Sequence, residues 1–372
     1  MLVAVGGLLG AAEIATPQQG FAHLRVFEDV VSLIRNGYVE EVDMDEVMAG
    51  AMRGLADGLD SSSAYLTPAE VRTINAGDAL PAGDVGLVVT RQFYLRVVGV
   101  RDGSSAARAG LKTGDFIRMI NGEPTRDMSA IAGTRLLRGA PESTVDVLVI
   151  RTNPADPHEF ALTREVLDDA AVSGRRLAGG EGYVRVSSFG PGTAAAIGEA
   201  ITALGPAADR GVVIDVRGIA NGSAVEGIAA ARHFVADGTL AVLTERDGPE
   251  TVTDTHDGDG ALTMPVVLLV SNGTAHAAEI FAAAMAGNER AELVGAPTAG
   301  LAGLQRLVRL PEGHGLWMTY ARYVTPDRDA IHGRGLVPDV PVFVPIVEFD
   351  DDPPATDLAL EKAVEQLRTQ VR

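Results

Sequence analysis

The sequence predicts a multi-domain α/β protein with an N-terminal helical segment, a β-rich domain and an α/β core. Its length of 372 residues exceeds the size of one compact domain, which is typically about 150 residues. The spacing of apolar residues is helical before residue 79, typical of short strands up to residue 168, and typical of alternating strands and helices after that. A hydrophobic fraction of 46% lets each part bury a core.

Residues 1–20 begin with an apolar stretch that reaches Thr16. This stretch is too short to span a bilayer and lacks the basic flank of a signal peptide. Two explanations are open: the remnant of an export signal or membrane anchor, or an apolar N-terminus that is frayed. The first explanation would place the protein outside the cytoplasm.

Residues 21–78 are expected to be helical. Apolar residues at helical spacing predict a first helix that begins at Phe21 and ends at Gly37. Asp43, followed three residues later by a glutamate, is typical of the cap of a second helix, which Gly58 ends. The apolar faces of the two helices either cover a core or pair two copies of the chain into a homo-oligomer.

Residues 79–168 are expected to form a β-rich domain. Residues 85–88 begin a strand behind a glycine-bearing loop, and residues 104–110 indicate a short capped helix that ends at a glycine. The apolar strand of residues 116–120 leads into an Asn-Gly pair, which is a strong signal for a tight turn. Apolar residues indicate one more helix, at Ile131, Leu136 and Leu137, and one more strand, at Val145, Val147 and Val149.

Residues 169–345 alternate strands with helices, which predicts an α/β core whose sheet is covered by helices. The expected strands lie at residues 183–187, 212–216 and 266–270, and the expected helices at residues 193–204, 223–235 and 275–285. The last of these strands leads through a Ser-Asn-Gly turn into a helix of small residues. Residues 346–372 are expected to be a linker followed by a C-terminal amphipathic helix.

The composition excludes several classes of function. The formal net charge is −19, so the chain lacks the clustered cations that nucleic-acid binding needs. It has no cysteine, which excludes disulfides and thiolate metal sites. The histidines are scattered without the close pairs of a metal site, and we expect no metal and no other cofactor. Only two lysines are present, Lys112 and Lys362.

Three segments together form a specific signature: LDSSSAYLTPAE at residues 59–70, AARAGLKTGD at 106–115 and ARYVTPDRDAIHGRGLVPDV at 321–340. In this order they are similar to the pre-PDZ, PDZ and closing segments of the C-terminal processing (tail-specific) peptidases, a family that the chain resembles from about residue 21 onward. The resemblance implies a PDZ-like β-rich domain and a core of the ClpP/crotonase-like type. It also implies a serine-type peptidase that is exported and is either periplasmic or anchored to a membrane facing the periplasm.

Two of the family's catalytic positions hold residues that cannot perform its chemistry. The family's Ser-Ala-Ser-Ala-Ser-Glu segment, whose middle serine attacks the substrate, falls on residues 274–279, so His276 stands in the nucleophile position. The segment with the lysine base and its glutamine partner falls on residues 295–305. Leu301 therefore replaces the lysine, 25 residues after position 276 with no gap required. Gln305 matches the glutamine and is either a relic of the site or a polar residue at a sheet edge.

A hydroxyl-imidazole pair is an alternative route to hydrolysis. It would join Thr274 or Ser271 to His276, with Glu279 orienting the imidazole. Thr274 and His276 are two residues apart, however, which on a helix points them to different faces. The other explanation is that His276 caps the start of a helix.

The loop after the strand at residues 212–216 also differs from the family. The family's Asp-Leu-Arg-Asn-Asn-Pro-Gly-Gly, whose glycine amides stabilise the oxyanion, falls on residues 215–222. Asn221 and Gly222 stand in the oxyanion positions, but the proline and the first glycine are missing. Because asparagine tolerates positive φ, the loop shape can persist without the family's chemistry.

The PDZ-like module is expected to bind apolar C-terminal peptides or unfolded protein tails by strand addition. The residues involved are Val85, Gly86, Leu87 and Val88, and backbone amides near residues 85–87 would receive the carboxylate. Asp84 adds a negative charge where the family usually has glycine. We therefore expect a peptide-binding pseudopeptidase, with an active paralogous peptidase as a further partner. The alternatives are an active serine-type peptidase with a rebuilt site and a carrier of small apolar ligands.

Deleting residues 1–16 should change the melting temperature by no more than about 2 °C, because the segment has no cap, period or polar face that would fix it in a core. Thermal unfolding followed by circular dichroism compares the deletion variant with the full chain. A fall of more than about 5 °C would mean that the segment packs against the folded part, and the export-signal explanation would lose its support.

Overall fold

The computed structural model describes residues 17–75, 80–152, 156–167, 172–349, 351 and 354–370. The apolar stretch at residues 1–16 therefore lies outside the described residues. The chain divides into two compact units, and the division falls between Gly54 and Leu55.

The first unit is helical, as predicted. It contains α1 (Pro17–Gly37) and most of α2 (Met44–Asp57). Asp43 caps α2, because its carboxylate accepts hydrogen bonds from the backbone amides of Asp45 at 2.9 Å and Glu46 at 3.3 Å. Within the described ranges, no helix is long and apolar enough to cross a membrane.

The β-rich domain is built on a six-stranded antiparallel sheet. Its strands are paired in the order β2-β3-β4-β6-β7, and β5 pairs with β4. In chain order, the elements are β2 (Leu87–Gln92), β3 (Tyr94–Val100), α4 (Ser105–Arg108), β4 (Phe116–Ile120), β5 (Glu123–Pro124), α5 (Ala130–Leu137), β6 (Thr144–Ile150) and β7 (His158–Thr163). The predicted strand at residues 116–120 is confirmed, and the turn after it has positive φ at Asn121 (50°) and Gly122 (81°). β2 lies at an edge of this sheet.

The α/β core contains a second six-stranded sheet, with the order β17-β14-β13-β10-β9-β8. The strands are β8 (Val172–Arg176), β9 (Gly182–Val186), β10 (Val212–Asp215), β13 (Val266–Val270), β14 (Glu292–Gly295) and β17 (Val340–Pro341). The helices are α6 (Thr193–Ala203), the 3-10 helix η1 (Gly205–Arg210), α7 (Ala224–Arg232), α8 (Ala277–Gly287) and α9 (Leu358–Gln370). All neighbouring strands pair in parallel except β8, which is antiparallel to β9. The predicted core strands and helices are present, and α8 begins two residues later than expected.

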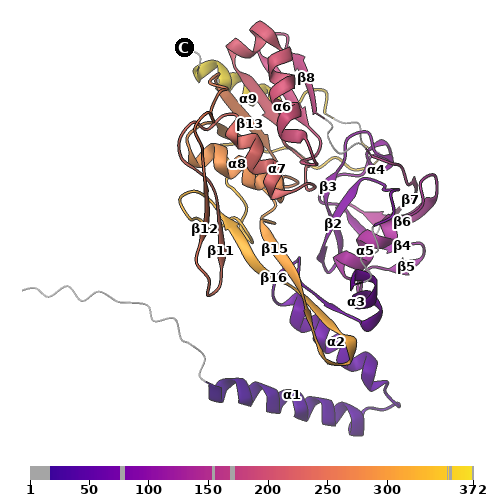
Figure 1. Cartoon of the computed structure of the whole chain (residues 1–372). Helices are drawn as coiled ribbons and strands as arrows, with labels where there is room; N and C mark the ends of the chain where they lie inside the picture. Colours follow the sequence, from indigo (N-terminus) through magenta and orange to yellow (C-terminus); the bar gives the residue numbers. More distant parts are fainter. Residues whose placement is uncertain are drawn as a thin grey trace, which may run out of the picture. The chain divides into compact units, whose positions relative to one another are not determined.

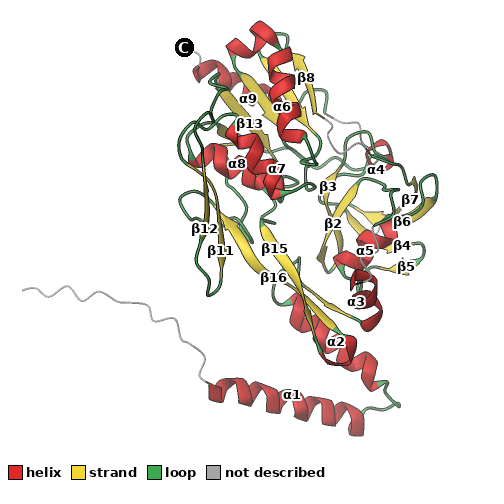
Figure 2. Cartoon of the chain, in the orientation of Figure 1, coloured by secondary structure: helices red, strands yellow, loops and turns green. Residues whose placement is uncertain are grey.

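Helices cover both faces of this sheet (Figures 1 and 2). Successive side chains of a strand point to opposite faces, which decides where each one packs. Val184, Ile214 and Leu268 lie on the face covered by α6, α7 and α8. Val213 and Val267 lie on the other face, against α9. Burial on both sides explains the continuous apolar sequence of β13.

Another sheet of the core has no counterpart in the sequence prediction. Its order is β1-β16-β11-β12, and β15 also pairs with β16. The strands are β1 (Ala64–Leu66), β11 (Thr239–Glu245), β12 (Thr251–Asp254), β15 (Gly303–Arg309) and β16 (Gly315–Val324). β1 lies in the region expected to be helical and is followed by α3 (Pro68–Asn75). A strand of three residues shows no usable period, and its partner β16 is remote in sequence.

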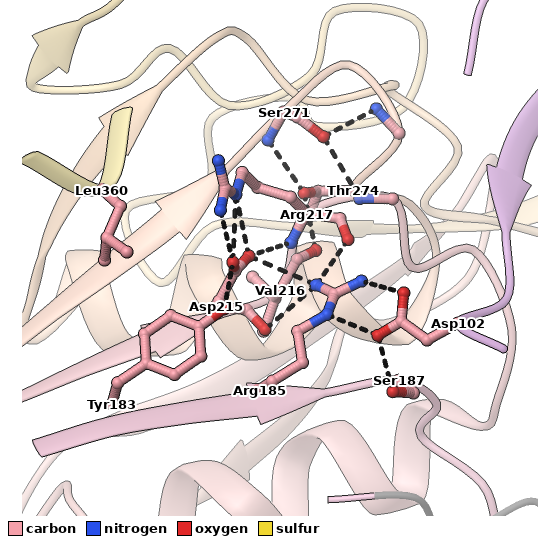
Figure 3. Close-up of polar contacts among 12 residues, drawn as sticks. Asp102, Tyr183, Arg185, Ser187, Asp215, Val216, Arg217, Ser271, Thr274 and Leu360 are labelled. Carbon is pink, nitrogen blue, oxygen red and sulfur yellow. Dashed lines mark hydrogen bonds and ion pairs between the residues drawn. The ribbon is translucent and has the colours of Figure 1, made fainter. Parts of the chain in front are cut away.

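A buried carboxylate holds the end of β10 in place (Figure 3). Asp215 is 2% exposed. It accepts hydrogen bonds from the Tyr183 hydroxyl at 2.8 Å, from Nη1 of Arg185 at 3.2 Å and from Nη2 of Arg217 at 2.6 Å. A hydroxyl and two guanidinium groups thus satisfy an acid whose burial would otherwise be strongly unfavourable.

The two arginines extend this network through the second unit. Arg185 binds the carboxylate of Asp102, between β3 and α4, at 2.7 and 3.0 Å. Arg217 binds Asp357 at 3.0 and 2.7 Å. Asp357 also accepts the amide hydrogen of Leu360 at 3.1 Å and so caps α9. One network therefore joins the core sheet, the β-rich domain and the last helix.

Asp215→Asn should lower the free energy of unfolding by about 3 kcal/mol, because it leaves two guanidinium groups without their common counter-ion. Urea unfolding measures the difference from the wild type. Asp102→Asn is the matched control, since the Asp102 side chain is 46% exposed, and we expect it to lose less than about 1 kcal/mol. Equal losses in the two variants would show that burial of Asp215 is not the cause.

Candidate active site and peptide groove

The turn between β13 and α8 holds His276 in a strained backbone conformation. Its φ is 50° and its ψ is −118°, which few residues other than glycine adopt. His276 occupies the N-cap position of α8, and its carbonyl accepts the amide hydrogens of Glu279 and Ile280, but its side chain makes no capping hydrogen bond. A sharp, strained strand-to-helix turn is the geometry that exposes a nucleophile. The turn therefore carries an imidazole at the position where the family resemblance implies the nucleophile.

The imidazole of His276 is uncharged at neutral pH. Burial is the main cause and lowers the pKa of His276, and the nearby His332 ring lowers it further. A hydrogen bond with the backbone of Leu301 raises the pKa and so offsets part of this shift. The resulting pKa is about 4.

Leu301, which the family resemblance places at the position of the lysine base, lies in an apolar environment. Its side chain is 7% exposed and packs with Val98, Ala220 and Ala275. A general base must accept the proton of the nucleophile, and an aliphatic side chain has no group that can do so. Position 301 therefore contributes to packing between the core and the β-rich domain, not to proton transfer.

Glu279 fixes the loop that carries Leu301. Its buried carboxylate accepts hydrogen bonds from the Thr298 hydroxyl at 2.5 Å and from the amides of Gly300 at 2.7 Å and Leu301 at 2.8 Å. Burial raises the pKa of Glu279, while these hydrogen bonds act in the opposite direction. The carboxylate is thus engaged with this loop, not with the imidazole that the rebuilt-site hypothesis requires it to orient.

His276, Leu301 and Gln305 meet in one pocket of about 310 Å³. Much of the remaining lining is apolar and includes Ile74, Leu80, Val88, Val89, Ile131 and Trp317. Nε2 of Gln305 donates to Oγ1 of Thr319 at 3.2 Å. The structure therefore brings together the three residues that the family resemblance placed at the catalytic positions.

The hydroxyl groups of the rebuilt-site hypothesis are engaged with the backbone. The Thr274 hydroxyl donates to the Val216 carbonyl at 2.9 Å and accepts the amide hydrogen of Ser271 at 3.0 Å (Figure 3). The Ser271 hydroxyl oxygen accepts the amide hydrogen of Gly218 at 3.2 Å. Thr274 would have to break its bond to Val216 before it could donate to His276.

Asn221 and Gly222, expected at the oxyanion positions, line a second pocket of about 370 Å³. This pocket includes residues 86–88, and His276 is not part of its lining. Gly222 has φ of 109° and lies against the Phe189 carbonyl, where a Cβ atom would be 2.2 Å from the oxygen. Only glycine fits this position, so the loop shape depends on it. The oxyanion role of these residues stays a prediction.

An aspartate and a histidine that the sequence analysis did not connect lie close to the first pocket. Nε2 of His332 is 3.3 Å from a carboxylate oxygen of Asp60. Burial raises the pKa of Asp60, but hydrogen bonds from His332, Thr319 and the Ser62 amide outweigh this and hold it well below its usual range. His332 also lowers the pKa of His276, so these two histidines are close in space although far apart in sequence. Asp60 and His332 both lie in the signature segments, at residues 59–70 and 321–340. Their place in these segments was the signal in the sequence that could have identified them.

No metal-binding cluster of three or more His, Cys, Asp or Glu side chains is present among the residues that the structure describes. The two imidazoles near the first pocket belong to different environments. One ring faces a mainly apolar pocket, and the other is paired with a carboxylate.

The residues expected to bind peptide lie at the start of β2, on the edge of the β-rich sheet. They are Val85, Gly86, Leu87 and Val88. Val88 lines both pockets, so β2 borders each of them. Farther along β2, the Ser61 carbonyl accepts hydrogen bonds from the Thr90 hydroxyl at 2.7 Å and the Arg91 amide at 3.3 Å. These bonds close the far end of the edge to an added strand.

The His276 ring should titrate with a pKa of about 4 and not near 6.5. Because the folded pKa lies below the unfolded one, His276 favours the folded state above pH 6.5, and this contribution is lost as the pH falls from 6.5 to 4. NMR titration of the imidazole Cε1–H signals measures the pKa, and His276→Asn identifies the signal. The variant should also lose about 2 kcal/mol less stability than the wild type between pH 7 and pH 4. A midpoint near 6.5 would contradict the buried, neutral ring.

Comparisons with known proteins agree with this architecture. Residues 180–342 match the model of peptidase family S41, and residues 96–151 match a PDZ domain. A carboxyl-terminal-processing protease of Synechocystis sp. is 31% identical over 277 residues, covering 73% of this chain and 65% of that protein. The chain thus spans slightly less than two thirds of the length of this relative.

Other relatives match over more of their length. The carboxy-terminal processing protease CtpA of Bacillus subtilis is 26% identical over 342 residues, covering 91% of this chain and 72% of that protein. The solved structure of a photosystem II D1 C-terminal processing protease has a TM-score of 0.70 at 26% identity, covering 95% of this chain and 93% of that one. The chain therefore belongs to the C-terminal processing proteases of peptidase family S41, with a PDZ domain and an S41 core.

Proposed function

We propose that this member of the family binds peptides without cutting them. The observation that carries the proposal is Leu301, which occupies the position of the lysine base within an apolar cluster. Without a proton acceptor, a hydroxyl nucleophile stays protonated near neutral pH. The chain also has an imidazole in place of that hydroxyl, so both halves of the family's dyad are absent.

Neither lysine of the chain lines the pocket that holds His276 and Leu301. Lys112 belongs to the β-rich domain, where the charges of Arg151 and Asp115 act on it. Lys362 lies on α9 and pairs with Glu365 at 2.7 Å. An arginine cannot act as a substitute base, because a guanidinium keeps its proton throughout the physiological pH range.

The features that would hold a peptide are present around β2. An extended segment can add to the edge of this strand, and its apolar side chains can enter the pocket lined by Ile131 and Trp317. Suitable ligands are apolar C-terminal peptides and unfolded protein tails. Such a protein would act as a scaffold, a decoy or a regulatory partner of an active paralogous peptidase. Residues 1–16 support an exported, periplasmic or membrane-anchored location for it.

Carriage of a small apolar ligand is a second candidate. It is favoured by the apolar side chains around the pocket of about 310 Å³, a volume at the lower end of the range for small-molecule sites. A peptide that displaces a fluorescent apolar probe from this pocket would favour the first candidate. Tight binding of the probe that no peptide displaces would favour the second.

The wild type should not hydrolyse peptides, and neither His276→Ser nor Leu301→Lys alone should start hydrolysis. The serine would lack a base, and the lysine would lack a nucleophile. The double variant should show at most weak cleavage, because the altered oxyanion loop can reduce the rate by about a hundredfold or more. Mass spectrometry of fragments from an unstructured substrate with an apolar C-terminus measures cleavage. Circular dichroism checks that Leu301→Lys, which buries a cation, still folds.

The result that would contradict the proposal is cleavage by the wild type that persists after repurification and is abolished by His276→Ala. Labelling by a fluorophosphonate probe would point in the same direction, toward a rebuilt serine-type site. Cleavage that His276→Ala leaves unchanged indicates a contaminating protease or a site elsewhere in the chain. Repurification with the probe present distinguishes the two, because a label that stays with this chain marks a site of its own.

A further inference from the structure

The loop that leads into β2 is anchored by backbone pairs. Gly83 and Gly139 exchange hydrogen bonds at 3.0 Å in both directions, and Asp84 and Glu165 do so at 2.9 Å. The backbone of Asp84 is therefore fixed independently of its side chain. Removing the carboxylate leaves these backbone bonds intact, so the loop position can be tested separately from its charge.

The Asp84 carboxylate turns back onto this loop. Oδ1 accepts the amide hydrogen of Gly86 at 2.8 Å, and Oδ2 pairs with the Arg138 guanidinium at 2.7 Å. Asp84 is 8% exposed, so these contacts are largely shielded from water. Gly86 is the middle residue of the three whose amides were expected to receive a ligand's carboxylate. Because an amide has one hydrogen to donate, this donor is already occupied.

We propose that Asp84 is a built-in substitute for the carboxylate of a peptide ligand, and that the groove along β2 takes internal segments of a polypeptide without selecting a free C-terminus. The proposal rests on peptide binding as the proposed function, and it replaces selection of a free C-terminus by binding of internal segments. A terminal carboxylate would meet an occupied amide, a guanidinium that is already paired and a charge of its own sign. An internal segment carries no terminal charge and avoids all three.

The second pocket provides space for a chain that continues past the loop. Its volume is about 370 Å³, and its lining reaches from residues 86–88 to residues 188–191 and 221–223 of the core. Arg101 also lines this pocket and has polar contacts of its own. A peptide that ended in a carboxylate at the loop would leave this volume unused, whereas an internal segment can extend into it.

Matched peptides test the proposal on the full chain. One apolar sequence is made with a free C-terminal carboxylate and with an amidated C-terminus, and fluorescence anisotropy measures the two Kd values. For the wild type we expect the values to agree within about twofold. Asp84→Ala releases the Gly86 amide and Arg138, so it should prefer the free acid by about tenfold or more, as expected for charge-assisted hydrogen bonds. Asp84→Asn is the matched control, because it keeps an oxygen for the amide, and its ratio should stay below about threefold.

A wild-type preference for the free acid of about tenfold or more would overturn the proposal. An Asp84→Asn variant that behaves like Asp84→Ala would also overturn it, because occupation of the amide would then not be the cause. If the wild type binds neither peptide, peptide binding itself fails, and hydrogen exchange at the Gly86 amide still tests Asp84 without a ligand. Exchange that is about tenfold faster or more in Asp84→Ala supports an occupied amide, and equal rates would overturn it.

Discussion

The buried carboxylate of Asp215 is the interaction on which the arrangement of the second unit depends. An acid this deeply buried is stable only when its oxygen atoms are fully bonded. The arginines that satisfy it also reach the β-rich domain and the last helix, so one charge positions three parts of the chain. The loop that follows Asp215 carries Asn221 and Gly222 into the pocket beside β2. The position of this loop therefore depends on the network around Asp215.

The backbone around His276 and Leu301 is fixed by local geometry and by one buried acid. The turn at His276 has a strained φ, and Glu279 holds the loop of Leu301 through backbone amides. Because these bonds involve the backbone of residue 301, they do not depend on which side chain it carries. Hydrolysis, in contrast, requires two specific side chains. The shape of this loop is therefore separable from the side chains that hydrolysis requires.

Three departures from the family pattern meet along one strand. Asp84 lies at the start of the groove, and His276 and Leu301 lie in the pocket that Val88 shares with it. Their positions in the sequence are far apart, and only the placement of β2 between the two pockets brings them together. The contacts of Asp84 with Gly86 and of Leu301 with its apolar neighbours are well formed.

The sequence by itself determined the features whose signals are local. The cap at Asp43, the Asn-Gly turn and the apolar strand β13 involve neighbouring residues. The family segments that imply dyad positions for His276 and Leu301 are likewise read from the sequence alone. Only the tertiary structure decided that β1 pairs with β16, and that Asp60 meets His332 across 272 residues of sequence. It also decided that Asn221 and His276 line different pockets. Such contacts arise when distant segments pack together, and no local period or spacing encodes which side chains will then meet.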